Sequence, residues 1–376
     1  MKGRQSSDIR IALCGDVMLG RGIDQVLPHP GDPKLYERYV PSALDYVALA
    51  ERANGPIRRP VSFSYVWGAA LVALCRIPPD LRIVNLETAV TRGGRPAPKG
   101  INYRMHPDNL PCLRAFGIDC CVLANNHVLD WGSAGLLETL DALGAAGLRI
   151  AGAGRSESEA WAPAVLALPD EGRALVFAVA LPSSGVPRQW AAGAGHPGVA
   201  FIDDVSPQNA AAVAAHINRH RQGDDVVIVS LHWGANWGYE VSPQERAFAQ
   251  TLIAEAGADI VHGHSSHHPK GIGVHHGKPI FYGCGDFLND YEGISGYESY
   301  RGDLSLLYMM TLSRSDRSCR GVEMRPFRIR RFRLETATAE EADWLQQRMD
   351  RECRRFGGGV TLRESRLVLS WQGGSS

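Results

Sequence analysis

The sequence lacks an excess of charge of either sign, because its 40 Lys and Arg residues equal its 40 Asp and Glu residues. A balanced chain has no basic field to attract nucleic acid, so we expect no nucleic-acid partner. It also lacks an apolar run of the roughly 20 residues that cross a bilayer, and residues 1–19 contain no apolar core of the signal-peptide type. We therefore expect no membrane partner and a cytoplasmic location.

The eight cysteines lack the CxxC spacing of zinc ribbons and redox motifs. Most of them lie in apolar, strand-like surroundings, so we expect free thiols that pack as small core residues rather than disulfides. What the chain has is length and apolar content: 376 residues, 44% of them hydrophobic, are enough for a sizeable core in one large domain or two ordinary ones. Nothing in the sequence indicates the oligomeric state.

Short apolar runs alternate with helical patterns along most of the chain. We expect strands at 9–17, 81–86, 120–123, 164–168, 175–180, 226–231 and around 260–261, and helices at 42–54, 63–75, 108–116, 133–146 and 243–256. This alternation predicts an α/β sandwich with mixed sheets. After residue 306 the pattern changes to strands at 308–312, 324–334 and 360–371 around a helix at 339–356. We assign 1–310 to a catalytic domain, and 311–376 to strands and a helix that complete it or are appended to it.

Several of the predicted strands end in a residue whose side chain can bind a metal ion. These residues are Asp16, Glu87, Asn126, His127, His232, His264 and His267. Strand ends in an α/β sheet meet at one edge, where such proteins place their chemistry. Carboxylates, an amide oxygen and imidazoles are the mixture expected of a dinuclear centre for Mn, Zn or Fe. Singly, a strand-end Asp is often a helix cap and a lone His is usually a hydrogen-bonded core residue, but this many together are hard to explain as caps.

Five segments of the chain carry a pattern that is more specific than strand ends alone. They are GDVMLGR (15–21), NLETAVT (85–91), ANNHVLDWG (124–132), LHWG (231–234) and GADIVHGHSSHH (257–268). In this order they resemble the motifs of the CapA family of poly-γ-glutamate biosynthesis proteins, which share the calcineurin-like metallophosphatase fold. The resemblance implies a metallophosphatase-like sandwich of two mixed β-sheets flanked by helices, with one or two divalent metal ions per chain.

The resemblance also implies a role for each of these residues. Asp16 and His267 would bind a first metal ion, Glu87 would bridge, and a second ion would be held by the remaining set of Asn126, His232 and His264. His127 matches the histidine that metallophosphatases use as a general acid, and Asp130 could orient it. Two departures weaken the first site: Met18 stands where the superfamily normally has a histidine, and Glu87 replaces the bridging aspartate.

Four further residues are candidates for substrate binding. Lys99 and Arg104 resemble the Lys and Arg that follow the second CapA motif and could pair with a substrate carboxylate, although a solvated loop explains them equally well. Lys270, just after the predicted metal loop, leaves the same alternatives open. Trp237 could wall a pocket for a peptide, or belong to a packed hydrophobic rim.

Soluble relatives of the family include lasso-peptide epimerases, so our first functional hypothesis is a metal-dependent isomerase with a peptide substrate. It would invert the Cα of a C-terminal residue, with His127 and a second group, such as Asp16 or Lys99, moving the proton. The alternative is a poly-γ-glutamate biosynthesis protein that hydrolyses or ligates γ-glutamyl, amide or phosphoester bonds. A third hypothesis is a binding protein with a vestigial centre. Fold resemblance alone does not decide between them.

Overall fold

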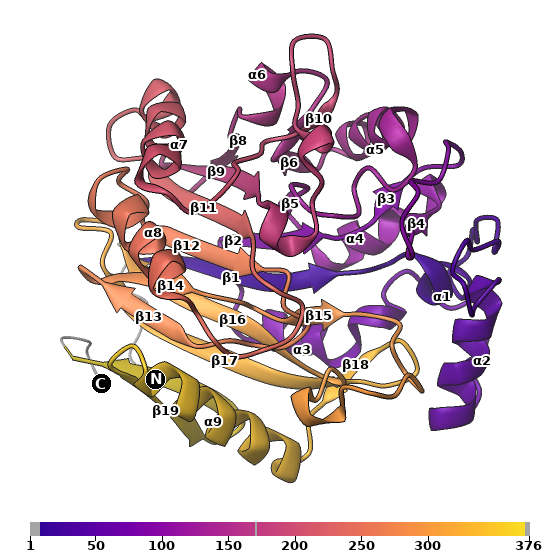
Figure 1. Ribbon diagram of the computed structural model, residues 1–376. Coiled ribbons are helices and arrows are strands. Elements are labelled where there is room, and N and C mark those ends of the chain that lie inside the picture. The colour runs from indigo at the N-terminus through magenta and orange to yellow at the C-terminus, as the bar shows by residue number, and fades with distance from the viewer. Residues whose placement is uncertain (1–7, 170, 373–376) are drawn as a thin grey trace.

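A computed structural model describes residues 8–169 and 171–372, which form two mixed β-sheets with helices packed around them (Figure 1). The α/β class predicted from the sequence is confirmed. In this part of the chain no helix combines the length and the apolar character needed to cross a membrane.

The first sheet has ten strands and is built around β1, which pairs in parallel with β2 and antiparallel with β16. Its order is β19-β20-β17-β16-β1-β2-β5-β6, with β15 beside β1 and β18 beside β17. The strands are β1 (Asp8–Val17), β2 (Leu81–Leu86), β5 (Cys120–Val122), β6 (Arg149–Ala151), β15 (Asp286–Leu288), β16 (Leu304–Ser313), β17 (Cys319–Ile329), β18 (Leu334–Thr336), β19 (Gly358–Arg363) and β20 (Arg366–Trp371). The N-terminal strand therefore lies in the middle of the sheet.

The second sheet has six strands in the order β13-β14-β12-β11-β9-β8. They are β8 (Ala164–Ala167), β9 (Arg173–Ala180), β11 (Val226–His232), β12 (Ile260–His264), β13 (Ile272–His275) and β14 (Lys278–Phe281). Two short pairs, β3 (Ala89–Val90) with β4 (Arg104–Met105) and β7 (Ala153–Gly154) with β10 (Gly198–Val199), lie outside these sheets. Strands β9, β11 and β12 are parallel, so their carboxyl ends point the same way.

The central strands of the second sheet are buried on both faces, which is why they read as unbroken apolar runs. Val176 and Ile228 belong to the core shared with the first sheet, whereas Phe177 and Val229 pack into a second core. Helices α7 (Pro207–His220) and α8 (Pro243–Ala254) close that second core from outside. Successive side chains of a strand point to opposite faces of the sheet, so the same strands supply residues to both cores.

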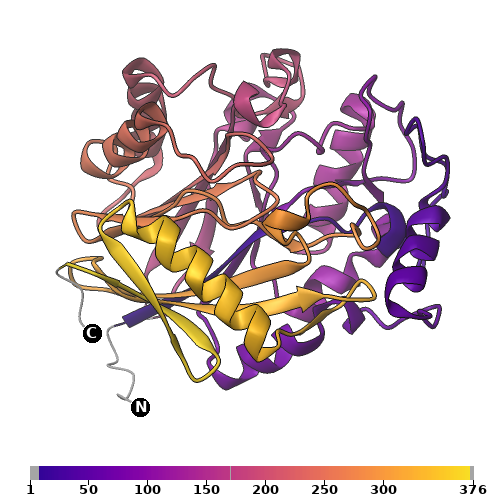
Figure 2. The same cartoon turned by 60° about the horizontal axis from the view of Figure 1, so that its bottom comes forward.

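The remaining helices cover the first sheet and the ends of the molecule. They are α1 (Arg21–Asp24), α2 (Ala43–Asn54), α3 (Gly68–Arg76), α4 (Pro111–Phe116), α5 (Gly132–Ala145), α6 (Glu157–Ala160) and α9 (Ala339–Arg354). Helices α3, α4 and α5 contribute apolar residues to the core of the first sheet. Helix α9, in yellow in Figure 2, packs over β19 and reaches β13. The C-terminal strands and helix are thus continuous with both sheets.

Three elements differ from the sequence prediction for local reasons. The helix expected at 63–75 begins only at Gly68, whose φ of 40° interrupts the chain after a 3₁₀ turn. The strand expected at 324–334 ends at Ile329, because Arg331 and Phe332 have positive φ and form a turn. The run at 360–371 is a hairpin of β19 and β20. The division at residue 310 stays a prediction, but β16 runs across that position.

Candidate metal centre

Six of the seven predicted strand-end residues come from the carboxyl ends of five strands that face each other across the two sheets. Asp16 is on β1, Glu87 follows β2, and Asn126 and His127 follow β5. His232 ends β11 and His264 ends β12, where the register places them side by side. His267 follows on the loop after β12. All of these residues are buried except Asn126, which is half-buried.

His232 and His264 form one half of the centre. Their Nδ1 atoms are 2.8 Å apart, and His232 Nε2 lies 3.1 Å from Asn126 Oδ1. Ser230 Oγ lies 2.7 Å from His264 Nε2, an interaction that occupies this nitrogen and leaves Nδ1 free for an ion. Ligand atoms of Asp16, His232 and His264 all lie within 4.8 Å of one another. Two imidazole nitrogens aimed at the same point as a carboxylate are the arrangement that a metal ion needs.

The other half of the centre contains a residue that the sequence analysis missed. Asp286, the first residue of β15, joins Asp16 and His267 in a second group whose ligand atoms lie within 4.8 Å of one another. His267 Nδ1 is 3.0 Å from Asp286 Oδ1, and Asn289 donates to Asp286 Oδ2 at 2.8 Å. Asp16 is therefore common to both groups. By position it is a shared carboxylate, a role that the resemblance gave to Glu87.

Asp286 could replace the ligand that is missing from the Asp16–His267 site, where Met18 stands in place of a histidine. Met18 is buried, and its sulfur accepts a hydrogen bond from the Tyr291 hydroxyl at 3.4 Å. The only local signal for Asp286 was its place after Gly285, near the end of an apolar segment. Its register opposite Asp16 is a tertiary feature of the β1–β15 pair.

The buried carboxylates of the centre need a cation to compensate their negative charge. Burial first, and then the charge of Asp286, raises the pKa of Asp16 to about 7. Burial and the neighbouring Asp16 raise the pKa of Glu87 well above its ordinary range. Glu87 Oε2 is buried and has no hydrogen-bond partner among the described residues. A divalent ion would compensate these carboxylates, so the donor set fits the predicted Mn, Zn or Fe.

The imidazoles of His232 and His264 are in the right state to serve as ligands. Burial, together with neighbouring basic groups, lowers the pKa of His232 and of His264 well below the ordinary value. Both rings are therefore neutral near pH 7, and a neutral imidazole has the lone pair that binds a metal ion.

His127 lies beside the centre, and its ring contacts Asp130. Its Nδ1 is 2.6 Å from Asp130 Oδ2, which also accepts the backbone N–H of Tyr103 at 2.6 Å. This contact keeps the proton on Nδ1, so Nε2 faces Glu87, 3.8 Å from its Oε1. Burial is the main cause that lowers the pKa of His127 to about 4. A neutral imidazole with a free Nε2 next to a metal centre can accept a proton from water.

The four predicted substrate-binding residues occupy different places. Lys99 reaches the centre: its Nζ is 2.7 Å from Asp130 Oδ1 and donates to the backbone oxygen of Asn126. Trp237 lines the cavity described below. Arg104 is instead held on the Trp131 ring, with its guanidinium carbon 3.9 Å from the ring centroid.

Lys270 lies under the loop after β11 rather than at the cavity. Its ammonium donates to the backbone oxygen of Glu240 at 3.3 Å, and burial lowers its pKa. Neither Lys270 nor Arg104 lines the cavity. Both side chains have structural partners of their own, and a role for them in substrate binding stays a prediction.

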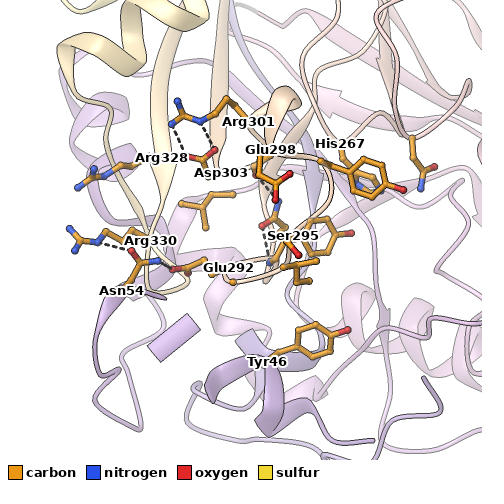
Figure 3. Close-up of a pocket in the computed structure, with 18 of the residues that line it drawn as sticks. Tyr46, Asn54, His267, Glu292, Ser295, Glu298, Arg301, Asp303, Arg328 and Arg330 are labelled. Carbon is orange, nitrogen blue, oxygen red and sulfur yellow. Dashed lines mark hydrogen bonds and ion pairs between the residues drawn. The ribbon is translucent and has the colours of Figure 1, made fainter. Parts of the chain in front are cut away.

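A cavity of about 970 Å³ opens beside the half of the centre that contains His267 and Asp286 (Figure 3). Its lining includes His267 of the centre, Tyr291 and the exposed Ile101, Ile294 and Tyr297. The Tyr297 ring stacks on Trp237 at a centroid distance of 4.1 Å, so the wall has a rigid aromatic face. This volume is at the upper end of ordinary ligand sites, which indicates room for a substrate of several residues.

Comparison with known proteins gives matches over most of the chain. Residues 10–291 match the family model described as bacterial capsule synthesis protein PGA_cap. The probable polyglutamine synthesis accessory protein of Mycobacterium tuberculosis (strain H37Rv) is 47% identical over 362 residues, or 96% of this chain and 95% of that protein. The PGA biosynthesis protein CapA of Bacillus subtilis (strain 168) is 26% identical over 278 residues, or 73% of this chain and 62% of that protein. A solved phosphatase from Mycoplasma pneumoniae has a TM-score of 0.44 and 13% identity, covering 89% of this chain and 96% of its own.

Proposed function

The chain belongs to the bacterial capsule synthesis protein PGA_cap family, and we propose that it acts there as a metal-dependent hydrolase of amide bonds in a glutamyl-based chain. The observation that carries the proposal is the position of Asp16, which is shared by two ligand groups next to His127. The names of the relatives, which refer to polyglutamine and PGA synthesis, support the choice of polymer.

The described residues would divide the work as follows. Asp16, His232 and His264, with Asn126 nearby, would hold one divalent ion, and Asp16, His267 and Asp286 would hold the other. A divalent ion in this position supplies a Lewis acid for the carbonyl of the scissile bond.

Proton transfer would fall to His127. Its Nε2 would accept a proton from the attacking water while Asp130 holds Nδ1 on the opposite edge of the ring. The same Nε2 would then donate that proton to the leaving amine nitrogen. The amide C–N bond breaks as the new C–O bond forms, so the products are one carboxylic acid and one amine. Lys99, whose Nζ lies 2.7 Å from Asp130 Oδ1, would hold this carboxylate in place.

Hydrolysis ranks ahead of the peptide epimerase that the sequence first favoured. The relatives described above have names that refer to polymer synthesis and contain no reference to an epimerase. Epimerisation also requires a second proton-transfer group on the other face of Cα. Of the two groups considered for that task, Asp16 lies among the metal ligands and Lys99 is paired with Asp130 on the His127 side.

One experiment separates these reactions. Terminally blocked γ-linked glutamate oligomers are incubated with the protein and Mn²⁺, Zn²⁺ or Fe²⁺ in D₂O, and the products are analysed by mass spectrometry and chiral amino-acid analysis. Hydrolysis gives shorter chains with new ends, whereas epimerisation gives chains of unchanged length with deuterium at Cα and D/L inversion.

We expect shorter chains that depend on both metal and His127. His127→Ala should abolish cleavage, while His196→Ala, at an exposed histidine outside the centre, should leave it unchanged. Unchanged oligomers with all three metals would refute the hydrolase proposal. Deuterium uptake without cleavage would replace it with the epimerase.

A further inference from the structure

The cavity beside the centre contains four arginines, and three of them are already paired. Arg21, Arg301 and Arg328 each contact a carboxylate, at 2.5 Å (Asp290), 2.8 Å (Asp303) and 3.2 Å (Glu335) respectively. Their charges are compensated within the protein. These three arginines therefore shape the cavity wall without leaving a free cation for a ligand.

Arg330 is different from the other three. Its Nε donates to the neutral side-chain oxygen of Asn54 at 3.1 Å, and within residues 8–169 and 171–372 no carboxylate pairs with it. Arginine stays charged at any physiological pH, and its terminal nitrogens form a planar fork that matches a carboxylate. Arg330 is thus an uncompensated cation among the residues that line a cavity next to the metal centre.

The backbone around Arg330 is firmly held. The turn after β17 is fixed by Glu292, whose carboxylate accepts the backbone N–H groups of Arg331 at 2.7 Å and Phe332 at 2.6 Å. Asn54 donates to the same carboxylate at 2.5 Å, so its oxygen points to Arg330. Figure 3 shows this chain of contacts on the opposite side of the cavity from His267. A cation on such a support is preorganised for a ligand.

Four carboxylates line the cavity, and none of them compensates Arg330. Asp303 pairs with Arg301, and Glu341 pairs with Arg301 and Arg328. Glu292 is occupied by the turn, as described. Glu298 accepts the backbone N–H of Gly296 at 2.9 Å and is exposed to solvent, where its field is screened.

We propose that Arg330 binds a carboxylate of the substrate, so that the protein selects chains with free carboxylates over chains with carboxamides. This inference rests on the proposed function, because it concerns the same cavity and the same polymer. The reacting amide would lie at the metal centre, and a carboxylate further along the chain would reach Arg330. The residue is therefore a specificity determinant rather than a catalytic residue.

Binding measurements test this assignment apart from turnover. The full chain is loaded with metal in a His127→Ala background, and calorimetry measures the Kd of two blocked oligomers of equal length, one of γ-glutamate units and one of the corresponding carboxamides. Arg330→Gln removes the charge but retains an N–H donor for Asn54. Arg333→Gln is the matched control, since Arg333 is an exposed residue of the same turn that does not line the cavity.

We expect Arg330→Gln to raise the Kd of the carboxylate oligomer about 10- to 100-fold, as for loss of a charge-assisted hydrogen bond. The Kd of the carboxamide oligomer should change less than about twofold, Arg330→Lys should restore part of the affinity, and Arg333→Gln should bind like the parent.

Other outcomes would overturn the inference. Equal weakening of both oligomers would reduce Arg330 to a structural role, and unchanged binding of both, or no binding by the parent, would remove it from the substrate path. Selective weakening without cleavage by the wild-type protein would uphold Arg330 while refuting the hydrolase, so the two failures are distinguishable.

Discussion

Replacement of Asp286 by asparagine should weaken one metal site while preserving the shape of the side chain. Asp286 Oδ1 lies 3.0 Å from His267 Nδ1 and belongs to the ligand group that includes Asp16. In the metal-free protein its charge is, after burial, a cause of the raised pKa of Asp16. In the metal-free protein, Asp286→Asn should therefore relieve the repulsion between Asp286 and Asp16. In the metal-bound protein, it should remove a charged ligand.

The size of the effect can be worked out. Loss of an outer partner of a ligand costs roughly 10- to 100-fold in metal affinity, so loss of a direct ligand should cost about 100-fold or more, or about 2.7 kcal/mol. At a metal concentration of about 1,000 times the wild-type Kd, the ion stabilises the wild type by about 4.1 kcal/mol and the variant by about 1.4 kcal/mol. For a chain of this length the difference corresponds to about 3 °C in Tm.

Calorimetric titration and thermal unfolding, each with and without Mn²⁺ or Zn²⁺, measure both quantities. Met18→Leu is the control, since a volume-conserving change at this buried residue should leave the metal-induced shift unchanged. Wild-type metal affinity and stoichiometry in Asp286→Asn would refute the assignment of Asp286 as a ligand.

Three further predictions concern other parts of the structure. Asp130→Asn should lower kcat about 100- to 10,000-fold in the oligomer assay, because His127 loses the partner that fixes its tautomer; an unchanged kcat would exclude this role. Burial lowers the pKa of His262 to about 4, so protonation of this residue favours the unfolded state. The free energy of unfolding should therefore fall by up to about 3 kcal/mol as the pH drops from about 6.5 to 4. Urea unfolding of His262→Gln should show a shallower pH dependence, and the same dependence as in the wild type would contradict this. Gly15→Ala should destabilise the protein by about 3 kcal/mol or more, since the new Cβ would lie 1.7 Å from a backbone oxygen. Gly144→Ala should stabilise the protein by about 0.5–1 kcal/mol, because this position in α5 has open space around it. Equal unfolding midpoints of the two variants would refute the packing argument.

The residues of the centre that could be predicted from the sequence are those that follow a recognisable apolar strand. Asp16, Glu87 and His232 each follow a run of apolar residues, and such runs are strands whose ends meet at one edge. Asp286 escaped notice because its strand has three residues and its value depends on lying opposite Asp16, far away in the chain. A short strand carries too little periodicity to be recognised.

The surroundings of the centre were harder to predict than the centre itself. Lys99 lies on the loop before β4 and Arg104 is the first residue of β4, yet only Lys99 reaches the centre, because the Arg104 guanidinium packs on the Trp131 ring. Arg330 carries no motif, and its availability depends on which arginines nearby find carboxylates. Such choices among similar partners are made by tertiary packing, which a single sequence does not display.

The central place of β1 has a consequence for how the protein is made. Asp8 pairs with Ser313, and β1 also donates Asp16 to the centre. At a synthesis rate of about 5–20 residues per second, this strand emerges from the ribosome on the order of 15 to 60 s before its antiparallel neighbour exists. During that interval one edge of the nascent sheet is open to other chains, so chaperone dependence during translation should be concentrated there.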